Sequence, residues 1–129
     1  MNKEKLIKQI ESEHFTADEF SCRCCGLSNM SQEFIDKLDI ARSFSKTPYI
    51  ITSGSRCRLH NTDIGGHPES MHLATIVHES EACDISANTA RKRHAILYGL
   101  FKAGFSHIGI GKDFIHVDIS KRKGVWGYY

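Results

Sequence analysis

Residues 111–120, with the sequence GKDFIHVDIS, decide how the rest of the chain is interpreted. Apolar residues alternate with His116 and Asp118, the period of two that is typical of a β-strand with one apolar and one polar face. The preceding segment SHIGI, the turn GKD and the strand FIHVDI together form a hairpin. This stretch therefore predicts two antiparallel strands of a small sheet. An imidazole and a carboxylate on one strand face form either a solvated surface or the floor of a metal site.

The composition of the 129 residues is that of one globular domain, which we expect to span 1–129. A net charge of +2 argues against a nucleic-acid partner. No apolar run approaches the about 20 residues of a membrane span, and the start of the chain lacks the apolar region of a secretory signal. We therefore expect a protein made in the cytoplasm without membrane insertion. We also expect a monomer, because a chain of this length can bury a core of its own.

Alternating and helical patterns together predict the class of fold. Apolar residues at helical spacing near the start of the chain predict an amphipathic helix over 1–14. The other expected elements are helices over 32–44 (capped by Ser31) and 89–103 (started by Ser86 or Asn88 and closed by Gly104), strands over 49–52 and 82–86, and a long polar loop over 53–70. Short, mostly antiparallel strands and two main helices predict an α+β domain, with helices packed on one side of a small sheet.

Three polar residues in these elements suggest a metal centre: His72 after the long loop, Asp84 in the strand ACDIS, and His116. Two imidazoles and one carboxylate fill three corners of a tetrahedral zinc site and leave the fourth for water, as in a catalytic site. Zinc would make hydroxide available near neutral pH and would polarise a substrate carbonyl. Other histidines are expected at the surface or in packing roles: His14, His94 and His107.

Two further residues are candidates for catalysis. Asp113 precedes His116 by three residues and is placed to act as a general base, although aspartate is also common in hairpin turns. Arg56 in the segment SGSR can hold a carboxylate or a developing oxyanion through its charged, forked guanidinium, although a surface arginine is an equal alternative.

Taken together, these segments resemble the zinc D-Ala-D-Ala carboxypeptidase family. That family also includes phage endolysins that cut the L-alanyl-D-glutamate bond and the vancomycin-resistance D,D-dipeptidases. The resemblance covers about residues 15–126 and implies a Hedgehog/D,D-peptidase fold. It is carried, in the family's order, by FTADEFSCRCCG (15–26), TSGSRCRLHNTDIGGHPESMHL (52–73), EACDIS (81–86), KAGFSHIGIGKDFIHVDIS (102–120) and Trp126.

The resemblance implies a role for each matching residue. It implies one catalytic Zn²⁺ bound by His72, Asp84 and His116. It implies a general base at Asp113 and contact of Arg56 with the substrate. The remaining implied roles are substrate orientation by Ser70 and tuning of the metal site by Asp118.

The chain departs from the family between the first two implied ligands. The segment HLATIVHESEACD, residues 72–84, is longer than usual and lacks the family's glycine. We expect the extra residues, from Ala74 to His78, to bulge outward. His78 is then an alternative ligand to His72, which has the family's Ser-x-His context.

The cysteines Cys22, Cys24 and Cys25 resemble the family's lead-in, and Cys57 follows the key arginine. Three interpretations remain open. The thiols are free in a reducing cytoplasm, or the cluster forms a disulfide with Cys57 after release into an oxidising space, or the cysteines bind a separate structural zinc. A structural zinc site requires two separated pairs of ligands, and Cys57 supplies only one member of the second pair.

The sequence therefore predicts a zinc peptidase that hydrolyses an amide bond in peptidoglycan stem peptides, of carboxypeptidase or endopeptidase type. We expect a phage or prophage lysis enzyme that reaches the cell wall or periplasm through a lysis system. The alternative is a module of the same fold that binds peptidoglycan or a protein without cutting it.

Overall fold

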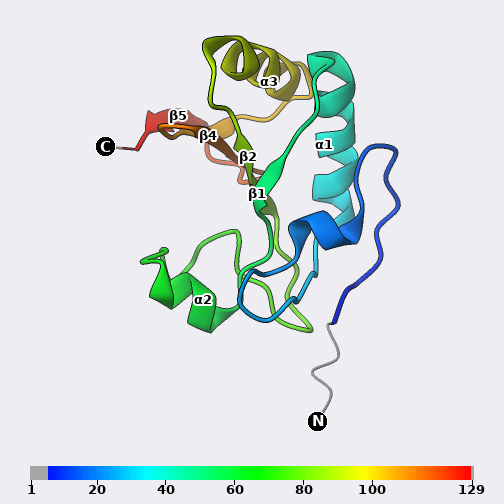
Figure 1. The fold of residues 1–129 in the computed structure, drawn as a ribbon, viewed down its shortest axis with the longest axis vertical. Helices are drawn as coiled ribbons and strands as arrows, with labels where there is room; N and C mark the ends of the chain where they lie inside the picture. The colour runs from blue at the N-terminus through cyan, green and yellow to red at the C-terminus, as the bar shows by residue number, and fades with distance from the viewer. Residues whose placement is uncertain (1–5, 129) are drawn as a thin grey trace.

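The computed structural model describes residues 6–128 as an α+β fold built around one five-stranded sheet (Figure 1). The strands lie in the order β1-β2-β4-β3-β5, and neighbours are antiparallel except for β3 and β5. The strands are β1 (Ile51–Ser53), β2 (Ala82–Ser86), β3 (His107–Ile110), β4 (Phe114–Asp118) and β5 (Gly124–Gly127). The helices are the 3₁₀ helix η1 (Ala17–Phe20), α1 (Gln32–Ser45), α2 (Arg58–Asp63) and α3 (Ala90–Lys102).

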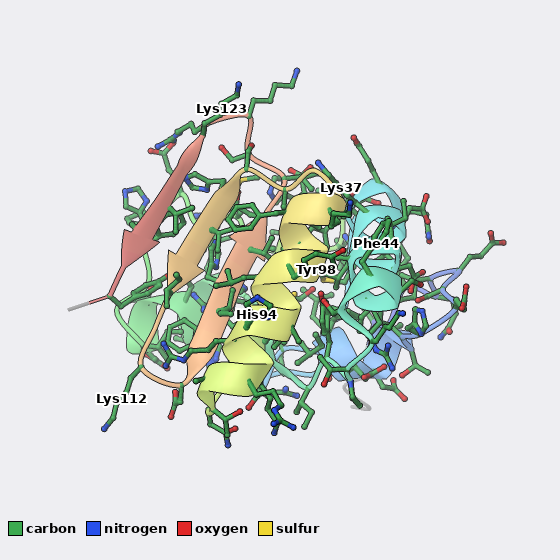
Figure 2. The ribbon with its side chains drawn as sticks, turned by 90° about the horizontal axis from the view of Figure 1, so that it is seen from above. Lys37, Phe44, His94, Tyr98, Lys112 and Lys123 are labelled. Carbon is green, nitrogen blue, oxygen red and sulfur yellow. The ribbon has the colours of Figure 1, made fainter. Side chains whose placement is uncertain are left out.

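The two long helices cover one side of the sheet. Figure 2 shows α3 lying over the sheet, roughly along the strands, with α1 beside it, and Figure 1 shows α2 well apart from both. The core between the helices and the sheet includes Phe34 and Leu38 from α1, Ile96 from α3, and Ile115 and Val117 from β4. The predicted α+β class, with helices on one side of a mostly antiparallel sheet, is confirmed.

Local signals predicted both long helices well. The Ser31 hydroxyl accepts a hydrogen bond from the Phe34 N–H at 3.3 Å and caps α1 as expected. The start of α3 is corrected, because Thr89, and not Ser86 or Asn88, caps it by accepting from the Lys92 N–H. In the described residues no helix has both the length and the apolar composition that crossing a bilayer requires.

The helix predicted over 1–14 is wrong for the residues that the structure describes, from Leu6 onward. Residues 1–5 lie outside the described part. The Lys8 N–H donates to the Ser28 carbonyl at 2.8 Å, and the Ser28 N–H donates to the Leu6 carbonyl at 2.9 Å. This pairing with a distant segment uses the backbone groups that a helix would need, so tertiary contacts override the local helical pattern.

Three elements were absent from the sequence prediction, of which the short 3₁₀ helix η1 is one. The helix α2 lies inside the loop predicted over 53–70, and β5 pairs in parallel with β3. The segment GVWG that forms β5 begins and ends with glycine and is too short to alternate, so it carries no strand signal of its own. Its pairing with β3 nevertheless brings Trp126 opposite Gly109.

Helix α3 packs closely against α1 at Gly99, where a side chain does not fit. A Cβ atom there would overlap the Ser45 hydroxyl and the Ala41 carbonyl of α1. We expect Gly99→Ala to lower the free energy of unfolding by about 1–3 kcal/mol, measured by urea denaturation. In an unhindered helix, the same replacement of glycine by alanine would instead raise the free energy of unfolding by roughly 1 kcal/mol.

The control for this prediction is Gly124→Ala in β5, where an added Cβ would meet no atom within 4 Å. This variant should change the free energy of unfolding much less. A Gly99→Ala protein as stable as the parent would show that the two helices separate at little cost.

Candidate metal centre and substrate cavity

Two of the three candidate ligands lie directly opposite each other in the sheet. Asp84 of β2 pairs in register with His116 of β4, so their side chains leave the same face. The apolar partners Ile85 and Ile115 point to the opposite face, into the core. The alternation that identified the strand therefore separates the core from the candidate site.

The third candidate ligand, His72, reaches this face from the loop before β2. Its Nδ1–H donates to the Gly54 carbonyl at 2.8 Å, and its backbone N–H donates to the Ser70 hydroxyl at 3.1 Å. Its carbonyl accepts the Arg56 N–H at 2.8 Å. These bonds fix both the backbone and the ring of His72, which is only 2% exposed.

The atoms that could bind a metal ion, one from each of these three residues, converge on one point. His72 Nε2 lies 3.2 Å from Asp84 Oδ1 and 3.1 Å from His116 Nδ1, and the last two atoms are 3.0 Å apart. Asp84 and His116 are each 8% exposed. Zinc ligands at about 2.0–2.2 Å in tetrahedral geometry are about 3.3 Å from one another, close to the separations seen here.

The hydrogen bonds on the far side of each ring show that a cation fits this point. The His72 Nδ1–H is used by Gly54, and the His116 Nε2–H donates to Asp118 Oδ2 at 2.7 Å. His72 Nε2 and His116 Nδ1 therefore direct lone pairs toward each other and toward the Asp84 carboxylate. Buried acceptors in this arrangement repel one another unless a cation lies between them. The donor set of two imidazoles and one carboxylate suits zinc.

The environment of Asp84 and His72 favours the protonation states that metal binding requires. Burial alone would raise the pKa of Asp84, but the neighbouring rings of His116 and His72, which donate hydrogen bonds to it when their facing nitrogens are protonated, hold this pKa well below its usual value. Burial lowers the pKa of His72 and keeps this imidazole neutral. For His116, burial lowers the pKa, but hydrogen bonds to Asp118 and Asp84 raise it above its usual value. An ionised carboxylate and a neutral imidazole are the forms that bind a metal ion.

Asp118 links the candidate ligand His116 to a second histidine. Its carboxylate accepts from His116 Nε2, from His107 Nδ1 at 2.9 Å and from the Ser120 N–H at 2.9 Å. Burial would raise the pKa of Asp118, but these hydrogen bonds lower it below its usual value. Asp118 is thus an anion that selects the tautomer of His116, as a carboxylate behind a metal-binding histidine does.

The three candidate metal ligands, His72, Asp84 and His116, lie at the floor of an open cavity of about 690 Å³. This volume is in the range of sites that bind small molecules or short peptides. The walls combine charged, polar and aromatic side chains, among them Arg56, Glu69, Ser70, Phe114, Trp126 and Tyr128.

Comparison with known proteins identifies the family. The family model of peptidase M15 matches residues 13–118, which is most of the chain. The chain belongs to the peptidase M15 family. No curated protein matches it. M15 membership agrees with the predicted resemblance and implies the Hedgehog/D,D-peptidase fold, a metallopeptidase and a peptide substrate. The buried cluster of His72, Asp84 and His116 is consistent with the zinc site of such a peptidase.

In this M15 family member, Arg56 lies in the cavity wall beside the candidate metal ligands. Its guanidinium is 3.3 Å from Asp84 Oδ2 and donates to Ser53 Oγ at 3.1 Å and to Asn61 Oδ1 at 3.4 Å. Burial lowers the pKa of Arg56, although Asp84 acts in the opposite direction. An arginine held on several sides is positioned to bind an anionic group of a ligand.

The structure does not bring Asp113 into the cavity. Asp113 is exposed in the turn before β4 and does not line the cavity wall, whereas Phe114 and His116 do. The physical reason is the period of the strand, because residues an odd number apart point to opposite faces unless the backbone bends. The role of Asp113 as general base stays a prediction from the resemblance.

The longer segment between His72 and Asp84 bulges outward as expected over residues 75–78, whereas Ala74 is buried. Thr75 and His78 close a turn through the Thr75 N–H and the His78 carbonyl at 3.0 Å. The tip of the turn, Ile76 and Val77, is 70% and 89% exposed. His78 is also exposed and does not line the cavity, so the structure places His72 and not His78 beside Asp84.

Sequence reasoning missed the part of the site that comes from β3 and the C-terminal residues. His107, assigned a surface or packing role, lines the cavity and pairs in register with Asp118. Trp126 packs against both histidines of this network with tilted rings, and its ring centroid is 4.5 Å from that of His107 and 5.6 Å from that of His116. Extending the hairpin register outward from the GKD turn would have paired His107 with Asp118.

Proposed function

We propose that this protein is a zinc-dependent peptidase that hydrolyses an amide bond in peptidoglycan stem peptides. The bond would be the one cut by a D-Ala-D-Ala carboxypeptidase or by an L-Ala-D-Glu endopeptidase. One observation carries the proposal: His72 Nε2, Asp84 Oδ1 and His116 Nδ1 meet at the floor of a cavity with their lone pairs directed at one point. Membership of the M15 family supports it.

When bound, zinc would supply a water of lowered pKa and polarise the carbonyl of the substrate. The residues of the chain would bind and orient the peptide. Arg56 would pair with a carboxylate of the stem peptide, because its guanidinium lies in the cavity wall. Ser70 would orient the peptide backbone from the same wall. Asp113 would move the proton from the attacking water to the leaving amine.

The proposal extends to the biological setting. We propose a lysis enzyme of a phage or prophage, made in the cytoplasm and acting on the cell wall or periplasm after release by a lysis system. The resemblance to endolysins supports this setting. The loop from Ser53 to Ser70 would set specificity for D-amino acids, since residues at both ends of it line the cavity.

One observation favours the alternative of a non-catalytic binding module. A binder needs no general base, and the exposed Asp113 does not line the cavity. In such a module the same cavity would hold a peptide or a protein segment without cutting it.

Digestion of purified peptidoglycan separates the two functions. A peptidase should release new free amino groups, lose this activity with a chelator and regain it with added zinc. Mass spectrometry of the fragments would show which bond is cut. Binding to peptidoglycan without chelator-sensitive release would support the binding module.

Replacing Arg56 with lysine tests the proposed carboxylate contact. Lysine keeps the charge but loses the fork that reaches Ser53, Asn61 and Asp84. We expect kcat/KM on a stem peptide to fall about 10–100-fold, since hydrogen bonds to charged groups contribute about 1.5–3 kcal/mol. The matched control is Arg58→Lys, at an exposed position of α2. Unchanged kcat/KM for Arg56→Lys would remove Arg56 from the substrate site.

A further inference from the structure

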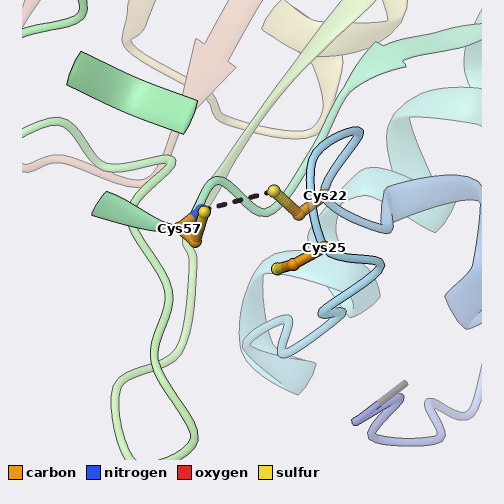
Figure 3. Close-up of side chains that lie close together, drawn as sticks. All are labelled: Cys22, Cys25 and Cys57. Atoms are coloured by element: carbon orange, nitrogen blue, oxygen red, sulfur yellow. Dashed lines mark hydrogen bonds between the residues drawn. The ribbon is translucent and has the colours of Figure 1, made fainter. Parts of the chain in front are cut away.

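We propose that Cys22, Cys25 and Cys57 bind a second metal ion, zinc, through three thiolates. Their sulfur atoms all lie within 4.8 Å of one another. Cys22 and Cys25 come from the segment between η1 and α1, and Cys57 comes from the loop after β1. Figure 3 shows the side chains of Cys22 and Cys25 directed toward Cys57. This site is separate from the cavity, because none of the three cysteines lines it.

The local backbone is shaped so that the first two sulfurs point the same way. Cys22 and Cys25 have the Cys-x-x-Cys spacing that is common in structural zinc sites. The Gly26 N–H donates to the Cys22 carbonyl at 2.8 Å, and the Cys22 N–H donates to the Leu27 carbonyl at 2.7 Å. Gly26 has a φ of +80°, which glycine adopts without strain and which closes this turn.

Backbone N–H groups stabilise sulfur in the charged form that a metal requires. The Cys57 N–H donates to Cys22 Sγ at 3.5 Å, and the His60 N–H donates to Cys57 Sγ at 3.4 Å. Thiolates that accept N–H bonds are the usual state of zinc-bound cysteine.

Three converging sulfurs favour a metal ion over a disulfide. A disulfide would join two of them and leave the third beside it without a partner. Zinc–sulfur bonds of about 2.3 Å place sulfurs about 3.8 Å apart, and the sulfurs of the cluster already lie within 4.8 Å of one another. His60 is spaced from Cys57 as Cys25 is from Cys22, but it lies outside the cluster and would have to move toward the sulfurs to fill the fourth position. The bound ion would tie the segment before α1 to the loop that carries Arg56.

Cobalt substitution of the full chain, kept reduced with a phosphine, tests the proposal. Thiolate ligands give cobalt an intense near-ultraviolet charge-transfer band, which the sulfur-free site at His72 cannot produce. We expect this band in the parent protein and about two zinc ions per chain in the zinc form. Cys25→Ser should lose the band and about one zinc ion, whereas Cys83→Ala, whose buried side chain lies outside the cluster, should keep both.

The cobalt–thiolate band tests the cysteine site independently of the proposed peptidase function. The band should persist in His72→Ala, which removes a cavity ligand, so loss of activity and loss of the thiolate site can be distinguished. The parent spectrum alone decides the matter if Cys25→Ser does not fold. A reduced parent protein without the band would overturn the proposal. So would a disulfide from Cys57 to Cys22 or Cys25 in protein purified without oxidant.

Discussion

Asp84→Asn is expected to abolish metal binding at the cavity and to lower turnover about 10³-fold or more, because a catalytic metal contributes several kcal/mol to transition-state stabilisation. The Asp84 carboxylate lies between the ring nitrogens of His72 and His116 and also pairs with Arg56. Asparagine has nearly the same shape but is neutral and a poor zinc ligand. Metal analysis after dialysis and amine release from a stem peptide would measure both effects.

A matched control for this prediction is Asp36→Asn, which makes the same chemical change on the exposed side of α1. It should retain metal and activity. Circular dichroism should show that Asp84→Asn still folds, because the amide fills the same space. If Asp84→Asn kept a full complement of metal, the cluster of His72, Asp84 and His116 would not be the metal site.

Asp113→Asn is expected to lower turnover about 10²–10⁴-fold while the metal stays bound, which is the range for loss of a general base. The Asp113 side chain is exposed, and its carbonyl accepts the Ala87 N–H at 2.8 Å, a bond that asparagine keeps. The variant should therefore fold normally. Catalytic hydrogen bonds are often long before the substrate binds, so the exposed position is compatible with a role in the complex.

The neighbouring exposed turn residue Lys112 provides the control, as Lys112→Gln (Figure 2). This variant should keep full activity. Full activity of Asp113→Asn would instead assign the proton transfer to another carboxylate, such as Glu69 in the cavity wall. Loss of metal from Asp113→Asn would show that Asp113 acts on the metal site and not as a base.

Much of the fold was predictable from local patterns. The stripe of α1 and the alternation of β2 and β4 depend on periods of side-chain burial that a sequence displays directly. The first residues were mispredicted, because the backbone near Leu6 pairs with Ser28, far along the chain. The strand around Trp126 was missed for a similar reason, since it exists only through its pairing with β3.

The candidate site was also predictable from the sequence only in part. The residue types of a zinc peptidase, and the assignment of His72 to the first position in preference to His78, followed from motifs in the sequence. The exposed position of Asp113 and the place of His107 in the cavity wall did not follow. Both depend on how the hairpin meets the other strands, which a spacing along the chain does not specify.

The sequence by itself determined the family, the class of fold and the residue types of the candidate metal centre, because periodicity and ordered motifs are local properties of side chains. Only the tertiary structure brought these groups together at one point: two imidazoles and a carboxylate in the cavity, and Cys57 beside Cys22 and Cys25. The physical reason is that these groups are brought together by strand register and loop packing between distant segments, and no local preference of the chain encodes those contacts.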